Sequence, residues 1–346
     1  MMHITKTVSR WISAILMGCT PFCSAMIISE HPSVISGPQS GLQRPEGISF
    51  SPSGNCMAIA DSECNAILFY KYTGNAKHPF EKIPSSEIKD NDLLNYVHDL
   101  EYSPGGEFIG AVSRETNTVV IYKKKEHDPI EFEENNFWHM RGSASKLDNP
   151  ASLSFSSNGK VLAVCNRMGG SGITFYSQVE DSEGEYSPIP FQSISERSLL
   201  KHNISAPHGI AFSPDGKTMS VVHKPFYKDT ERLGKEAVAI FELAENPHPV
   251  INSTPIFFKL LGNKCLHSVA FHPSGKYFAT VAEEGWVVIY KKVNDTGEFV
   301  VVKILDVLRK DNKYLSPKGI DFSPNGNYLA ITLETPAIYI YEISGY

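Results

Sequence analysis

Three histidines and a glutamate occupy one position of a sequence unit that recurs six times along the chain. Imidazole and carboxylate groups gathered in one ring could hold a metal ion, act as general acids and bases, or bind an anionic group of a small ligand. The favoured interpretation is a solvated, hydrogen-bonded channel mouth that holds no ligand. The six residues at this position, each directly before a repeat unit, are Glu46, His98, Ala151, His208, His267 and Lys318.

The repeat unit itself combines an aromatic residue with Ser-Pro-x-Gly or a close variant of it. In the fourth unit, for example, Gly209 begins the segment GIAFSPDGKTMSVV. The aromatic residues recur at intervals of 51 to 59 residues, close to the period of propeller blades. They are Phe50, Tyr102, Phe155, Phe212, Phe271 and Phe322.

Each unit predicts a β-hairpin, because alternating apolar and polar residues lead into a Gly-containing turn and a second apolar stretch. Glycine is expected at the turn for its positive φ. A third strand follows, as in TVVIYKK from Thr118, and then a less regular fourth, as in FVVVKIL from Phe299. Four strands per unit are typical of a propeller blade. The turn glycines are Gly54, Gly106, Gly159, Gly216, Gly275 and Gly326.

These strands must form a ring if the residues before each unit are to meet. The last unit has no fourth strand of its own, and the segment from Met26 to Ile35 could supply it. Such closure would remove open sheet edges. We therefore expect an all-β fold over residues 26–346, a six-bladed β-propeller with four-stranded antiparallel blades, its last blade closed by the N-terminal strand.

The segment FSPDGK from Phe212, with a downstream V-x-I-Y pattern, resembles the YVTN and lactonase-type propeller repeats, and less closely WD repeats. The resemblance covers Pro45 to Ile343 and implies the fold; those families include scaffolds, electron-transfer accessories and lactone hydrolases. Ala206-Pro207-His208-Gly209 resembles the lactonase family's His-containing start of an inner strand. Two departures are third strands that end in Tyr-Lys or Phe-Glu instead of Trp-Asp, and six units where the related phosphogluconolactonases have seven blades.

The first 25 residues predict a secretory signal peptide and hence export, to the periplasm or outside the cell. Lys6 and Arg10 precede the apolar run Trp11–Met17, and Cys23–Ala25 offers small residues for cleavage. A second interpretation is a lipid anchor at Cys19, because Leu16–Cys19 resembles a bacterial lipobox. No later segment is long enough to span a bilayer.

Composition and loops narrow the class of partner. The net charge of −6, and basic runs without interleaved aromatic residues, argue against nucleic-acid binding. Long connections should gather on one face, including an insertion from Lys224 to Glu236. Within it, Phe226 and Tyr227 are either a partner contact or a local cover for the loop.

The chain lacks a G-x-S-x-G elbow, an H-E-x-x-H motif and a phosphate-binding loop. The leading hypothesis is therefore a non-catalytic binding or scaffold module that needs no cofactor and takes a protein or small-molecule ligand on its loop-rich face. The alternative is a hydrolase of a small lactone or ester that uses His98, His208 and His267, with or without a metal. Cys56 and Cys64 could form a local disulfide, but buried free thiols are the favoured interpretation.

Overall fold

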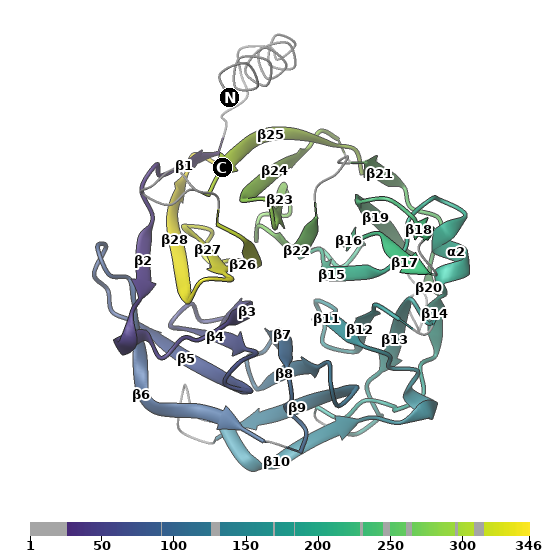
Figure 1. Ribbon diagram of the computed structural model, residues 1–346, viewed down its shortest axis with the longest axis horizontal. Coiled ribbons are helices and arrows are strands. Elements are labelled where there is room, and N and C mark those ends of the chain that lie inside the picture. The colour runs from purple at the N-terminus through teal and green to yellow at the C-terminus, as the bar shows by residue number, and fades with distance from the viewer. Residues whose placement is uncertain are drawn as a thin grey trace.

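The chain folds into a ring of antiparallel β-sheets around a central channel (Figure 1). The computed structural model describes residues 26–90, 92–125, 132–168, 170–182, 184–228, 231–244, 250–260, 265–294, 297–307 and 315–346. Within these residues, six sheets follow one another around the ring. The predicted six-bladed, all-β propeller is therefore confirmed. Residues 1–25, with the predicted signal peptide and Cys19, lie outside the described residues.

Each blade begins with its innermost strand and ends at the rim. The first three blades comprise β3 (Pro45–Phe50), β4 (Cys56–Asp61), β5 (Ala66–Tyr72), β6 (Phe80–Lys89), β7 (Val97–Tyr102), β8 (Phe108–Ser113), β9 (Thr118–Lys124), β10 (Phe132–Met140), β11 (Pro150–Phe155), β12 (Val161–Asn166), β13 (Ile173–Ser177) and β14 (Gln192–Ile194). The last three comprise β15 (Pro207–Phe212), β16 (Thr218–His223), β19 (Ala237–Ala244), β20 (Val250–Ile251), β21 (Phe257–Leu260), β22 (Leu266–Phe271), β23 (Tyr277–Ala282), β24 (Trp286–Lys292), β25 (Phe299–Asp306), β26 (Pro317–Phe322), β27 (Tyr328–Leu333) and β28 (Ala337–Ser344).

The connections that enter an inner strand contain the short helical segments η2 (Pro38–Ser40), η3 (Ser143–Ser145) and α2 (Glu196–Leu200). The insertion in the fourth blade forms its own hairpin of β17 (Phe226–Lys228) and β18 (Glu231–Leu233). Because neighbouring strands run in opposite directions, this hairpin and the connections into the inner strands emerge on one face, which we call the loop-rich face. No helix in the described part of the chain is long and apolar enough to cross a bilayer.

The recurring Ser-Pro-x-Gly segment closes the first hairpin of each blade on the opposite face. Its six glycines have φ between 66° and 75°, which confirms the predicted positive φ. The serine before the proline recurs because its side chain bridges the turn. Oγ of Ser51, for example, accepts a hydrogen bond from the N–H of Cys56 at 3.1 Å. Ser103, Ser156, Ser213 and Ser323 make the equivalent bond in their own blades.

The N-terminal segment closes the ring. Both β1 (Ile27–Ile28) and β2 (Ser33–Ser36) pair with β28, the third strand of the last blade. Figure 1 shows these purple strands alongside yellow β28 at the rim. The predicted closure is therefore confirmed, with two short strands in place of one.

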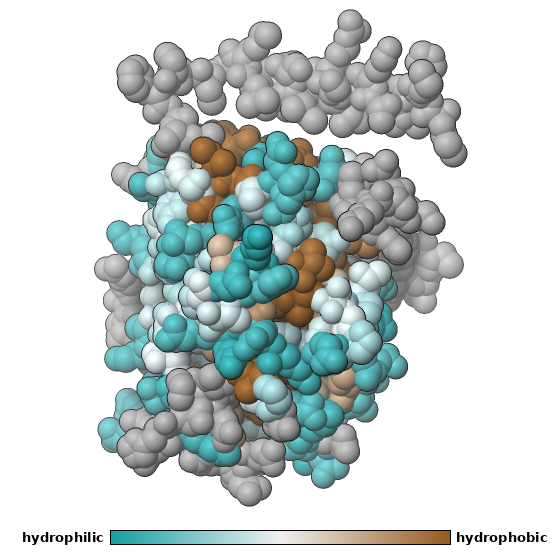
Figure 2. All heavy atoms as spheres, turned by 90° about the vertical axis from the view of Figure 1, so that its left-hand side faces the viewer, coloured by the Kyte–Doolittle hydropathy of each residue, from teal (hydrophilic) through white to brown (hydrophobic). Residues whose placement is uncertain are grey.

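The apolar core lies between neighbouring blades, where inner and middle strands of one sheet face the next. Phe69 of β5 and Tyr102 of β7, for instance, belong to one buried cluster that joins the first two blades. Fully burying such a side chain contributes about 1.5–3 kcal/mol. The side view in Figure 2 shows mainly hydrophilic residues at the rim, with separate hydrophobic patches. The ring is thus a rigid support for its loop-rich face.

Cys56, Cys64, Cys165 and Cys265 are free thiols in the structure. Cys56 begins β4, whereas Cys64 follows the far end of the same strand. Burial raises the pKa of the Cys56 thiol to about 11, as expected of an unreactive buried cysteine.

Candidate functional site

The six residues before the repeat units line the opening of the central channel on the loop-rich face. We call this opening the channel mouth. Every inner strand changes register with its partner at this residue, as between Val97 and Asp99 in β7 and between Pro207 and Gly209 in β15. The same irregularity marks β3, β11, β22 and β26. A β-bulge inserts one residue and re-aims its side chain. The bulges therefore explain why these six side chains turn toward the axis.

Three of the mouth residues are histidines that contact one another. The ring centroids of His208 and His267 are 4.3 Å apart, and each lies 5.1 Å from that of His98. One ring nitrogen from each histidine lies within 4.8 Å of the others. The second, fourth and fifth blades thus bring their imidazoles close enough to share a small guest.

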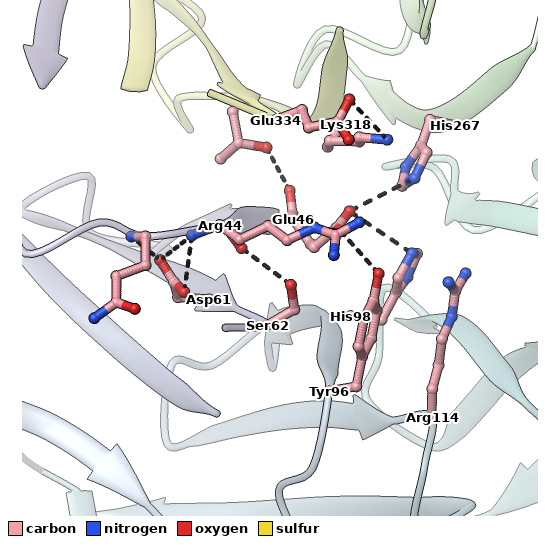
Figure 3. Close-up of polar contacts among 12 residues, drawn as sticks. Arg44, Glu46, Asp61, Ser62, Tyr96, His98, Arg114, His267, Lys318 and Glu334 are labelled. Atoms are coloured by element: carbon pink, nitrogen blue, oxygen red, sulfur yellow. Dashed lines mark hydrogen bonds and ion pairs between the residues drawn. The ribbon is translucent and has the colours of Figure 1, made fainter. Parts of the chain in front are cut away.

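Glu46 lies between two of these histidines, as Figure 3 shows. Its Oε2 is 3.8 Å from Nε2 of His98 and 3.6 Å from Nε2 of His267. Its Oε1 faces Nε of Arg44 at 3.5 Å and accepts a hydrogen bond from the Tyr96 hydroxyl at 3.4 Å. One carboxylate oxygen is held by the loop residues, and the other faces the imidazoles.

Backbone carbonyls fix the tautomers of two histidines. Nδ1 of His98 lies 2.5 Å from the carbonyl oxygen of Ala151, and Nδ1 of His208 lies 2.9 Å from that of His267. A carbonyl only accepts hydrogen bonds, so each Nδ1 carries the proton. In the neutral rings, Nε2 is therefore an acceptor with a lone pair.

Burial keeps the imidazoles neutral. It lowers the pKa of His98, His208 and His267 well below the ordinary value, and neighbouring cations lower it further. Burial also raises the pKa of Glu46, and the charges of Lys318 and Arg114 oppose that rise. The mouth thus presents lone pairs in place of imidazolium charge.

Three polar atoms at the mouth are buried without a hydrogen-bond partner. They are Oε2 of Glu46, Nε2 of His98 and Nε of Arg114. The mouth residues enclose a cavity of about 10 Å³, close to the room that one water needs. An unpaired buried polar group is costly. The mouth thus holds two acceptors and one donor whose hydrogen bonds a small guest could satisfy.

A second ring of side chains surrounds the mouth, and the sequence reasoning missed it. Its members share one repeat position, immediately after the second strand of each blade. Their backbone N–H groups bond to the residue before each inner strand, as Arg114 does to the carbonyl of Tyr96 at 3.2 Å. This shared repeat position is the sequence feature from which the second ring could have been predicted. The residues are Ser62, Arg114, Arg167, Lys224, Glu283 and Glu334.

Charge is divided unevenly around this second ring. Glu283 is paired with the ammonium groups of Lys224 and Lys318, at 2.9 and 3.0 Å. Burial would raise its pKa, but the two lysines outweigh burial and lower the pKa to about 2. Within the described residues, neither Arg114 nor Arg167 has a carboxylate within ion-pair distance. Burial and the charge of Arg167 lower the pKa of Arg114 to about 10, still charged at neutral pH.

Tyr96 forms one wall of the mouth and has a strained backbone. Its φ is 58°, a left-handed value that an aromatic residue rarely adopts. Its ring stacks on His98, and the guanidinium carbons of Arg44 and Arg114 lie 5.5 and 5.7 Å from its centroid. Such strain clusters at functional sites, so Tyr96 joins the candidate residues.

The remaining predicted residues have different places. Lys318 lies at the mouth but pairs with Glu283, and more distantly with Glu334 at 3.9 Å. Ala151 contributes its carbonyl and no functional side chain. The backbone of Phe226 and Tyr227 forms β17, on the loop-rich face, while their side chains lie outside the described part of the chain.

Deeper in the channel, acidic side chains link one blade to the next. Oδ2 of Asp321 accepts a hydrogen bond from the N–H of Phe50 at 2.7 Å, and Oε2 of Glu101 accepts one from the N–H of Phe155 at 2.8 Å. Burial raises the pKa of Asp321 to about 7 and that of Glu101 well above its ordinary value. These carboxyl groups hold neighbouring blades together through hydrogen bonds.

Comparison with known proteins agrees with this architecture. Residues 257–291, which span β21 to β24, match the model of the WD domain, G-beta repeat. No curated protein sequence matches the chain. Among solved structures it is similar to Hydrazine Synthase of Kuenenia stuttgartiensis, with a TM-score of 0.56 and 14% identity over 87% of this chain and 84% of that one. At that identity the likeness shows the fold alone. The chain is a β-propeller repeat protein with a WD-type repeat, while its resemblance to the YVTN and lactonase type stays a prediction.

Proposed function

We propose that this protein is a non-catalytic binding module that holds a carboxylate of a protein partner in the second ring of side chains, beside the channel mouth of its loop-rich face. Arg114 and Arg167 carry the proposal. They lie together on this face without a carboxylate partner among the described residues, and Nε of Arg114 is buried without an acceptor. A guanidinium group binds carboxylates through paired, charge-assisted hydrogen bonds. An acidic side chain or a chain terminus of the partner would supply the missing acceptor.

Export remains part of the proposal, supported by the pattern of the first 25 residues. Propeller scaffolds concentrate binding in loops on a rigid support. The β17–β18 hairpin widens the same face beside Lys224. A partner would therefore contact the loops of this face while its carboxylate meets Arg114 and Arg167 in the second ring, outside the cavity among the histidines.

The test compares capture of partners from native lysate by the wild-type chain and by charge-reversed variants. Arg114→Glu with Arg167→Glu should lose the captured protein. The matched control, Lys217→Glu with Lys276→Glu, changes exposed lysines at turns on the opposite face and should retain it. Circular dichroism checks that all variants are folded. Equal capture by both double variants, or no reproducible partner for the wild type, would contradict the proposal.

Hydrolysis of a small lactone or ester is the second candidate. The neutral imidazoles of His98, His208 and His267 favour it, because the Nε2 lone pairs of His98 and His208 could accept a proton. The cavity among them, at about 10 Å³, has room for a water but not for a lactone ring. A lactone panel tests this candidate: turnover that disappears in the triple His→Ala variant would make it the better account.

A further inference from the structure

We propose that the channel mouth binds one divalent transition-metal ion, Zn²⁺ by preference, through Glu46, His98 and His267, with His208 as a fourth ligand. Imidazole nitrogen and carboxylate oxygen are donors that zinc accepts readily. All four side chains are buried and reach the mouth from separate blades. This inference goes beyond the proposed binding of a partner and does not depend on it.

Two buried acceptors at the channel mouth have no hydrogen-bond donor among the described residues. Oε2 of Glu46 and Nε2 of His98 are both buried without a donor, 3.8 Å apart. A cation between them would satisfy both lone pairs at once. Nε2 of His267, 3.6 Å from the same oxygen, completes a set of three.

Two of the imidazoles are oriented as metal-binding histidines are. His98 and His208 each donate Nδ1–H to a backbone carbonyl, which leaves Nε2 free of a proton. Metal-binding histidines almost always make such a bond with their other ring nitrogen, because it fixes the ring and its tautomer. Burial also keeps these rings in the neutral form that binds metals.

The proposed ligand atoms lie almost as close together as the ligands of a zinc ion. Ligand atoms about 2.0–2.1 Å from a tetrahedral zinc ion lie about 3.3 Å apart. The two Glu46–imidazole distances, 3.8 and 3.6 Å, exceed this by about 0.5 and 0.3 Å, whereas the three histidine nitrogens lie within 4.8 Å of one another. Small side-chain rotations would close the set around one ion.

Nearby cations oppose the ion, and the structure shows which of them matters. Glu283 pairs with Lys224 and Lys318 and offsets one of their two charges. Arg114 acts directly, because its Nη2 donates to Nε2 of His208 at 3.0 Å. The guanidinium must therefore leave His208 before this imidazole can bind the ion. Removing Arg114 should strengthen metal binding, an effect that a merely structural histidine cluster would not show.

The experiment uses the full chain, stripped with a chelator and titrated with Zn²⁺ alone. We expect one zinc ion per chain by metal analysis, a rise in melting temperature on loading, and a tetrahedral visible spectrum with Co²⁺. Glu46→Gln, His98→Ala and His267→Ala should each weaken affinity at least tenfold. Arg114→Met should strengthen it at least threefold.

The control is His78→Ala, which removes an exposed histidine outside the mouth and should leave affinity unchanged. The melting temperature of each metal-free variant shows whether it is folded, and the zinc-induced rise in the wild type requires no variant. Substoichiometric zinc in the wild type, or equal affinity of His78→Ala and His98→Ala, would overturn the inference. Those results would leave a water as the guest and would not affect the capture of a partner.

Discussion

At the scale of single residues, the mouth holds uncharged imidazoles among charged groups. The three histidines stay neutral because burial disfavours their protonated form, and Arg114 and Lys224 disfavour it further. The sequence predicted which residues would meet, because one repeat position carries them. It could not predict their protonation, which depends on cations from other blades and on backbone carbonyls that accept from Nδ1.

These histidines should make the protein less stable in acid. Their pKa is lowered in the folded chain, so below about pH 6.5 each takes up a proton only on unfolding. The stabilisation present above that pH is lost as pH falls, at up to about 1.4 kcal/mol per pH unit for each histidine. Urea unfolding from about pH 7 to 5 should show this slope. It should be shallower in His98→Gln with His267→Gln and unchanged in His78→Gln; identical slopes in all three proteins would refute the prediction.

The channel carboxyls act in the opposite direction. Burial raises the pKa of Asp99 and Asp321 to about 7, so the folded chain binds their protons more tightly than the unfolded chain does. Their contribution is fully present below about pH 4 and is lost as pH rises through about 7. The contribution of the histidines is therefore obtained from the difference in the pH dependence of stability between wild type and variants, and not from the wild type alone.

At the scale of strands, β-bulges and close backbone approaches shape the mouth. The repeat units predicted the hairpins and turn glycines, because those depend on local periodicity and φ. The bulges were not predicted, because they add one residue without a distinct residue type. The ring that contains Arg114 and Glu283 was missed for a related reason: its position recurs, but its side chains change charge from blade to blade.

Substitution of Gly47 tests how closely neighbouring inner strands must approach each other. A Cβ at this position would lie 2.6 Å from Cα of Asp99 in the next blade. Backbone cannot move away cheaply, so Gly47→Ala should destabilise the protein by about 1–3 kcal/mol. Gly105→Ala is the matched control, since its new Cβ would have no neighbour closer than 3.9 Å. Chemical denaturation that finds equal stabilities for the two variants would contradict this account of the mouth.

At the scale of the whole molecule, the ring is closed by strands from the start of the described chain. Met26 and Ile28 are buried in the cluster between the last two blades. The sequence predicted this closure from the missing outer strand of the last unit. The division into two strands was not predicted, although Pro32, directly before β2, is a residue that interrupts strand pairing.

Deletion of residues 1–36 removes β1 and β2 and exposes the edge of β28. The loss of two buried apolar side chains should cost about 1.5–3 kcal/mol each. The open edge should also promote association. Thermal melting and size-exclusion chromatography measure both effects. Deletion of residues 1–25 keeps both strands and serves as the control; a chain starting at Gly37 that melts and elutes like this control would refute closure by these strands.

The unpaired Oε2 of Glu46 and Nε2 of His98 predict that the channel mouth holds a small guest. The most direct measurement is a high-resolution crystal structure of the zinc-loaded chain, with anomalous scattering at the zinc edge. We expect density on the axis in contact with Oε2 of Glu46 and Nε2 of both His98 and His267, with an anomalous signal. A mouth without such density, in which those atoms bond to other protein groups, would contradict it.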